Sequence, residues 1–96
     1  MMTYMIEKTV EEVALEKGEE CLKLFTTYCG HIDSYYKEIK SPLPSESVIE
    51  MSLHLLAYWY TGKEELTLDE AREAALFLQR VITFTFKHKK ALQTLN

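Results

Sequence analysis

The chain has 96 residues, of which 47% are hydrophobic and 27% are charged. This balance is typical of a folded soluble domain and excludes a disordered chain, and the length suits one domain with a modest core. Three glycines and two prolines are too few for the many turns of a β-sandwich. The net charge of -4 argues against a general nucleic-acid-binding protein, because such proteins carry a basic surface.

The charges are distributed unevenly along the chain. Residues 1–20 hold six glutamates and two lysines, whereas residues 80–96 hold four basic residues and no acidic one. This asymmetry predicts either that the two ends meet or that they steer a partner. The N-terminus lacks the pattern of a signal peptide, and no apolar stretch is long enough to span a bilayer, so we expect a cytoplasmic protein.

The first expected helix covers residues 9–40, where apolar residues recur at helical spacing. Thr9 and Glu12 have the spacing of a capping box, in which each side chain accepts a hydrogen bond from the backbone N–H of the other residue. Thr3 is an alternative start for this helix.

Two glycines and two cysteines lie within this first segment. Gly18 and Gly30 each disfavour a helix by about 1 kcal/mol relative to alanine, so either is a candidate kink or break that would produce four helices. Cys21 and Cys29 are eight residues apart, which on a helix separates them by about 12 Å. That separation is beyond the reach of a disulfide, so we expect two reduced, buried thiols.

The second expected helix covers residues 45–61 and follows a proline-containing linker, Ser41–Pro44, that cannot continue the first helix. Ser47 and the glutamate three residues later form a second candidate capping box, and Ser45 is a competing cap. Gly62 is suited to the left-handed position that ends a helix.

The third expected helix covers residues 67–93. Thr67 and Glu70 form a third candidate capping box. Residues 81–86, VITFTF, have the composition of a strand, but the helical spacing of the surrounding residues favours helix.

The lengths of the helices predict an assembly. At about 1.5 Å per residue, the outer helices reach about 40–45 Å and the middle one about 25 Å. The middle helix is also apolar around most of its circumference, since only three polar residues interrupt residues 48–60. We therefore predict an all-α bundle of three helices, long, short and long, completed by homodimerisation. If the first helix breaks, a closed four-helix monomer is the alternative.

Such a long-short-long helical dimer resembles the architecture of the all-helical chorismate mutases. That family holds a dianionic substrate with several arginines, whereas this chain has only Arg72 and Arg80 and no matching motif. The resemblance therefore implies an architecture and no mutase activity.

One polar seam on the middle helix is a candidate ligand site. Glu50 and His54 are four residues apart and can touch, and Tyr58 lies one turn further on. A carboxylate that orients an imidazole is the start of a general-base or metal site, although an exposed stripe on a mostly buried helix has the same pattern.

Two other clusters are weaker candidates. Cys29, His31 and Asp33 are close in sequence, but neighbouring positions on a helix point apart, so we expect no catalytic pair there. The basic end of the third helix, with Lys87, Lys89 and Lys90, suits either a helix C-terminus or contact with nucleic-acid phosphates.

Aromatic and large apolar residues are the candidates for an interface, because they bury large areas. They are Tyr35, Tyr36, Ile39, Tyr58, Trp59, Tyr60, Phe84 and Phe86. The sequence predicts a small protein–protein interaction module, such as an adaptor, inhibitor or regulatory subunit, that is not an enzyme and needs no cofactor or metal. Its alternatives are a nucleic-acid-binding regulator and a small-ligand-binding protein or enzyme. Small helical proteins of phages and other mobile elements often have this character.

Overall fold

The computed structural model describes residues 8–95, with side chains described for residues 8–89. Three helices make up this part of the chain: α1, Val10–Glu38; α2, Ser45–Thr61; and α3, Leu68–Leu95. No strand is present among the described residues, and the strand-like residues 81–86 are helical. The prediction of an all-α, long-short-long arrangement is therefore confirmed. The alternative start at Thr3 lies outside the described residues.

Two of the three predicted capping boxes are present. The Thr9 hydroxyl accepts a hydrogen bond from the Glu12 N–H at 3.2 Å, and the Glu12 carboxylate accepts one from the Thr9 N–H at 3.0 Å. These hydrogen bonds lower the pKa of Glu12. At α3, Thr67 and Glu70 exchange the same pair of bonds, at 2.9 and 3.1 Å. The second oxygen of Glu70 accepts from Lys63 Nζ at 2.8 Å.

The capping box predicted at Ser47 and Glu50 is wrong, and Ser45 is not a cap either. α2 begins at Ser45, and its N-cap is Pro44, which makes no side-chain hydrogen bond. The Pro44 carbonyl accepts from the N–H groups of Ser47 and Val48, so Ser47 already lies in the first turn. Pro44 has an extended backbone, with φ -60° and ψ 149°, which provides the entry into the helix without a polar cap.

The ends of α1 and α2 both use a left-handed residue. Gly62 follows α2 with φ 68°, as predicted, and its N–H donates to the Tyr58 carbonyl. After α1, the left-handed residue is Lys40, with φ 60°. The bonds from Lys40 N–H to the Lys37 carbonyl and from Ser41 N–H to the Tyr36 carbonyl form a Schellman motif, in which a glycine is more usual.

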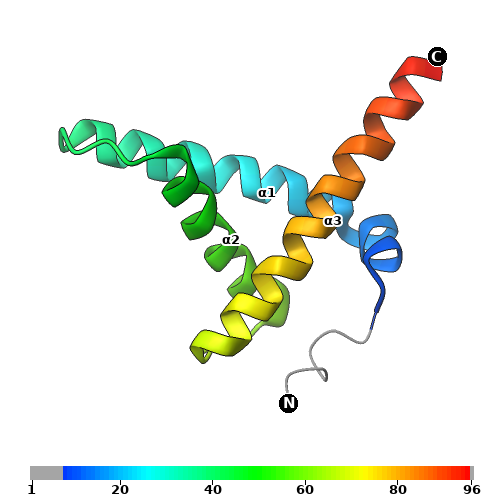
Figure 1. The fold of residues 1–96 in the computed structure, drawn as a ribbon, viewed down its shortest axis with the longest axis horizontal. Coiled ribbons are helices and arrows are strands. Elements are labelled where there is room, and N and C mark those ends of the chain that lie inside the picture. The colour runs from blue at the N-terminus through cyan, green and yellow to red at the C-terminus, as the bar shows by residue number, and fades with distance from the viewer. Residues whose placement is uncertain (1–7, 96) are drawn as a thin grey trace.

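α1 is one helix, so neither glycine breaks it. Gly18 is buried where α1 meets α3, whereas Gly30 is exposed with no neighbouring atom near its Cα hydrogens. The first turns of α1 run in a different direction from the rest of the helix (Figure 1). The four-helix alternative is therefore excluded.

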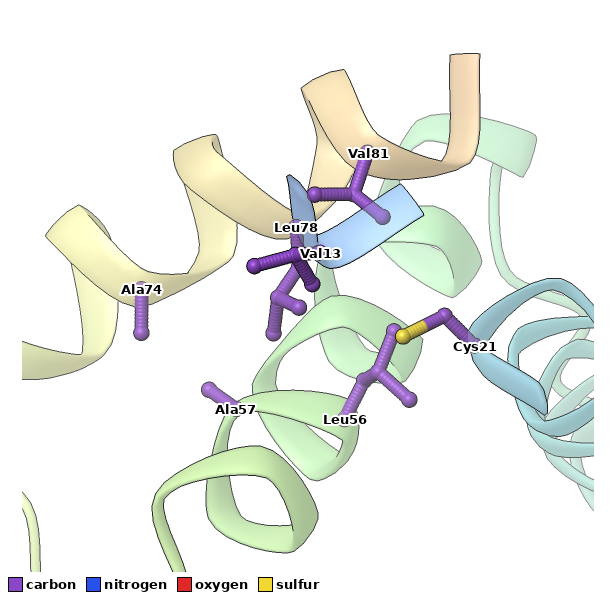
Figure 2. Close-up of a cluster of buried hydrophobic side chains, with 7 residues drawn as sticks. All are labelled: Val13, Cys21, Leu56, Ala57, Ala74, Leu78 and Val81. Carbon is purple, nitrogen blue, oxygen red and sulfur yellow. The ribbon is translucent and has the colours of Figure 1, made fainter. Parts of the chain in front are cut away.

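The core lies where all three helices meet. Figure 2 shows its seven side chains directed toward a common centre: Val13, Cys21, Leu56, Ala57, Ala74, Leu78 and Val81. Around this small core the fold is open. α1 crosses α3, α2 leads from the far end of α1 back to the start of α3, and the C-terminal end of α3 projects beyond both other helices (Figure 1).

Candidate interaction surface

α2 has a buried side and an exposed side. The buried residues Val48, Ser52, Leu53, Leu56 and Ala57 face the other helices, and the Ser52 hydroxyl is satisfied by the Val48 carbonyl at 2.7 Å. On the opposite side, the predicted polar seam of Glu50, His54 and Tyr58 is exposed. This exposed side is mostly apolar, because Met51 and Leu55 lie beside the seam.

A groove runs along each flank of the exposed side of α2. The α1–α2 groove has a volume of about 450 Å³ and is lined by Ile32, Glu50, Met51, His54, Leu55 and Tyr58. The α2–α3 groove has a volume of about 500 Å³, and its lining includes Leu53, Leu68, Arg72, Ala75 and Leu76.

Glu50 and His54 line both grooves, so the two grooves share a ridge. The ridge and grooves together form one continuous surface over three helices, which we call the α2 face. Its five most prominent apolar side chains, Met51, Leu55, Tyr58, Leu68 and Leu76, are between 36% and 60% exposed.

Two opposite charges lie on the α2 face without partners in the described part of the chain. Glu50 lies on the ridge and Arg72 lines the α2–α3 groove, and both residues are exposed. Neither forms an ion pair with a described residue, and Glu50 forms none with His54. The seam therefore does not contain the carboxylate–imidazole contact that a general-base site requires.

The predicted aromatic candidates divide into exposed and half-buried side chains. Tyr35, Ile39 and Phe86 are more than half exposed, and Tyr58 belongs to the α2 face. Tyr36, Trp59, Tyr60 and Phe84 are half-buried.

Trp59 and Tyr60 contribute to the interior of the fold. Both pack against the core, and Lys17 Nζ lies 5.7 and 5.8 Å from their ring centroids. Burial raises the pKa of Tyr60. These two aromatic side chains therefore help to join α2 to α1 and are less available to a partner than Tyr35 or Phe86.

One ion pair joins the basic end of α3 to the acidic first 20 residues, which agrees with the first of the two alternatives that the charge asymmetry left open. Lys89 Nζ lies 3.7 Å from the Glu19 carboxylate, and both side chains are largely exposed. Lys87 is exposed, and the side chain of Lys90 lies outside the described residues. The ring of Phe84 stacks on His88 at 6.2 Å.

The cysteines and the sequence cluster around Cys29 form no site in the described residues. Cys21 and Cys29 are free thiols, but the expectation that both are buried is wrong for Cys29, which is half-buried. Burial raises the pKa of Cys21 from 9.0 to about 11. Asp33 pairs with Lys37 at 3.0 Å, one turn along α1. Among the described residues, no group of three or more His, Cys, Asp or Glu side chains is placed to hold a metal ion.

The sequence predicted only Glu50, His54 and Tyr58 of the α2 face and missed most of its other residues. The residues of this face that were not candidate site residues include Ile32, Met51, Leu55, Leu68, Arg72 and Leu76. The available signal was the apolar circumference of residues 48–60, which is too wide for one buried side. Which residues of α1 and α3 flank it depends on how the helices cross.

In the part of the chain that the structure describes, no helix is long and apolar enough to cross a membrane. No protein-family model, curated protein or solved structure shows a significant match to this sequence.

Proposed function

We propose that this protein acts through protein–protein contact, as a small interaction module that is itself a homodimer. The observation that carries the proposal is the α2 face, where exposed apolar side chains from three helices line two adjoining grooves. Continuous apolar surface of this kind marks interaction sites, because soluble monomers seldom leave it uncovered.

The two alternative functions have less support. A nucleic-acid site at the end of α3 would use Lys89, but this lysine already pairs with Glu19. A ligand site in the α1–α2 groove has a suitable volume, yet its two polar groups, Glu50 and His54, lie on an open ridge and make no ion pair with each other. The interaction module needs only the apolar surface.

Light scattering on a sizing column, over a range of concentrations, tests the proposal. We expect a mass of twice 11.2 kDa. Met51→Lys, on the α2 face, should shift the mass toward the monomer, because a lysine amine is costly to bury. Leu15→Lys is the matched control, since Leu15 is 78% exposed on α1 and lines neither groove of the α2 face. A monomeric wild-type chain at all concentrations would overturn the homodimer.

A further inference from the structure

We infer that the α2 face binds a second copy of this chain, with the α2 ridge of each copy seated in the α2–α3 groove of the other. In this arrangement Glu50 of each copy faces Arg72 of the partner subunit. The inference rests on the proposed function, since it identifies the partner and the contacts of the surface described above.

The shape of the α2 face suits a two-fold arrangement. An isologous interface uses the same patch on both copies, so the patch must hold both a projecting part and its receptor. Here the ridge of Glu50 and His54 directly adjoins a groove of about 500 Å³. Leu53 and Ala75 line that groove, and alanine leaves room for a neighbouring helix to approach. Helices pack in this manner, with the ridges of one in the grooves of the other.

The apolar side chains are placed to cover one another in this arrangement. Leu68 and Leu76 belong to the receiving groove, and Met51 lies beside the ridge that enters it. A two-fold axis makes every such contact occur twice.

Charge gives the arrangement its specificity. Glu50 on the ridge and Arg72 in the groove have opposite signs, and neither is paired with another described residue. Burying either charge alone is costly, but an arginine–carboxylate pair forms strong, directional hydrogen bonds. When the ridge of one copy enters the groove of the other, two such pairs form about the axis.

A charge-exchange experiment tests this pairing. Glu50→Arg and Arg72→Glu are made separately, and Lys23→Glu, at an exposed position of α1 that lines neither groove, is the control. In the homodimer of either α2-face variant, like charges face each other twice, so we expect dimerisation at least about tenfold weaker than in the wild type. The control should dimerise like the wild type.

Mixing the two variants is the decisive step. The arginine introduced at position 50 then faces the glutamate introduced at position 72, and the natural Arg72 and Glu50 face each other at the second contact. We expect the mixture to form a heterodimer with near wild-type affinity, measured by light scattering and by native mass spectrometry, which resolves the two chains. Circular dichroism of each variant shows that it is folded.

The outcomes separate this inference from the proposed function. A wild-type dimer whose two variants also dimerise normally, or whose mixed variants remain monomeric, places the interface elsewhere and overturns the inference alone. A monomeric wild-type chain overturns the inference together with the homodimer on which it rests.

Discussion

The Thr85 hydroxyl of α3 occupies the space beside Gly18 of α1 where a larger residue would place its Cβ. A Cβ built on Gly18 would lie 2.2 Å from Thr85 Oγ1 and 3.1 Å from Thr85 Cγ2. Both residues are buried, and Thr85 Oγ1 has no hydrogen-bond partner among the described residues. The close contact between the two long helices at this point therefore depends on the absence of a side chain at position 18.

Gly18→Ala should destabilise the protein, although alanine is the better helix former. The helical preference of alanine is worth about 1 kcal/mol, and overpacking a tight contact costs about 1–3 kcal/mol. Since rotating Thr85 would exchange one close atom for another, we expect the clash to outweigh the preference. Urea denaturation at a fixed protein concentration measures the free energy of unfolding.

Gly30→Ala is the matched control for this effect, because no atom lies within 4 Å of the added Cβ. It should raise the free energy of unfolding by about 1 kcal/mol. Adding Thr85→Ala to Gly18→Ala should recover part of the loss, which a double-mutant cycle measures as a coupling between the two sites. Equal effects of alanine at positions 18 and 30 would contradict the close contact.

Adjacent leucines on α2 should respond differently to the same change. Leu56 is fully buried in the core, whereas Leu55 is 45% exposed on the α2 face. Leu56→Ala should lower the free energy of unfolding by about 2–5 kcal/mol, because it leaves a cavity. Leu55→Ala should weaken dimerisation while leaving the helix content unchanged. Thermal unfolding and light scattering on both variants distinguish the two effects. A larger drop in Tm for Leu55→Ala than for Leu56→Ala would contradict the orientation of α2.

The local features of this fold were predictable where one short pattern had one interpretation. The capping boxes at Thr9 and Thr67 were found because the residues that exchange hydrogen bonds are three apart in the sequence. The range 45–61 predicted for α2 matches the helix, but its cap was not found, because Ser45 and Ser47 both looked like caps and neither is used. Proline as an N-cap provides no side-chain acceptor that a pattern could reveal.

The long-range features were less predictable. Leu68 fits the apolar stripe of its helix, but it is the first residue of α3 and remains 60% exposed. The position of Arg72 across a groove from Glu50 depends on the crossing of α2 and α3. Crossing angles follow from the shapes of complete helix surfaces, so spacing within one helix does not define them.

Lys40→Gly should stabilise the protein. A left-handed backbone costs a non-glycine residue about 1–2 kcal/mol, and glycine removes this strain. Glycine also makes the unfolded chain more flexible, which offsets part of the stabilisation. We expect a net increase of roughly 0.5–1 kcal/mol in the free energy of unfolding, measured by urea denaturation. Lys40→Ala separates the backbone from the charge, because it removes the amine and keeps the left-handed strain.

Gly62 provides the reverse test at the end of α2. Its φ is 68° and no atom lies within 4 Å of an added Cβ, so Gly62→Ala introduces backbone strain without a clash. We expect Gly62→Ala to lower the free energy of unfolding by about 1 kcal/mol.

The Lys40 prediction has its own contradicting outcome. If Lys40→Gly and Lys40→Ala changed the free energy of unfolding equally, the lost charge rather than the backbone would account for the change.

The two cysteines should differ in reactivity. Thiolates react with disulfide reagents, and burial raises the pKa of Cys21 to about 11 while the side chain is fully buried. At pH 8 only about one Cys21 thiol in a thousand is then ionised. In native protein we expect one thiol, the half-buried Cys29, to react promptly with a colorimetric disulfide reagent. Cys29→Ser should remove that reaction, and both thiols of the wild type should react in urea.

The same pKa predicts an effect of alkaline pH on stability. The folded-state pKa of Cys21 lies above its ordinary value of 9.0. The contribution of the protonated thiol to the free energy of unfolding is therefore fully present below pH 9 and is lost as the pH rises toward 11. Burial also raises the pKa of Tyr60, so Tyr60 adds a loss in the same direction above pH 10. Denaturation curves between pH 8 and 11 should show a smaller alkaline loss in Cys21→Ala than in the wild type. An identical loss in both would mean that ionisation of Cys21 does not contribute, and Tyr60→Phe would then test the tyrosine in its place.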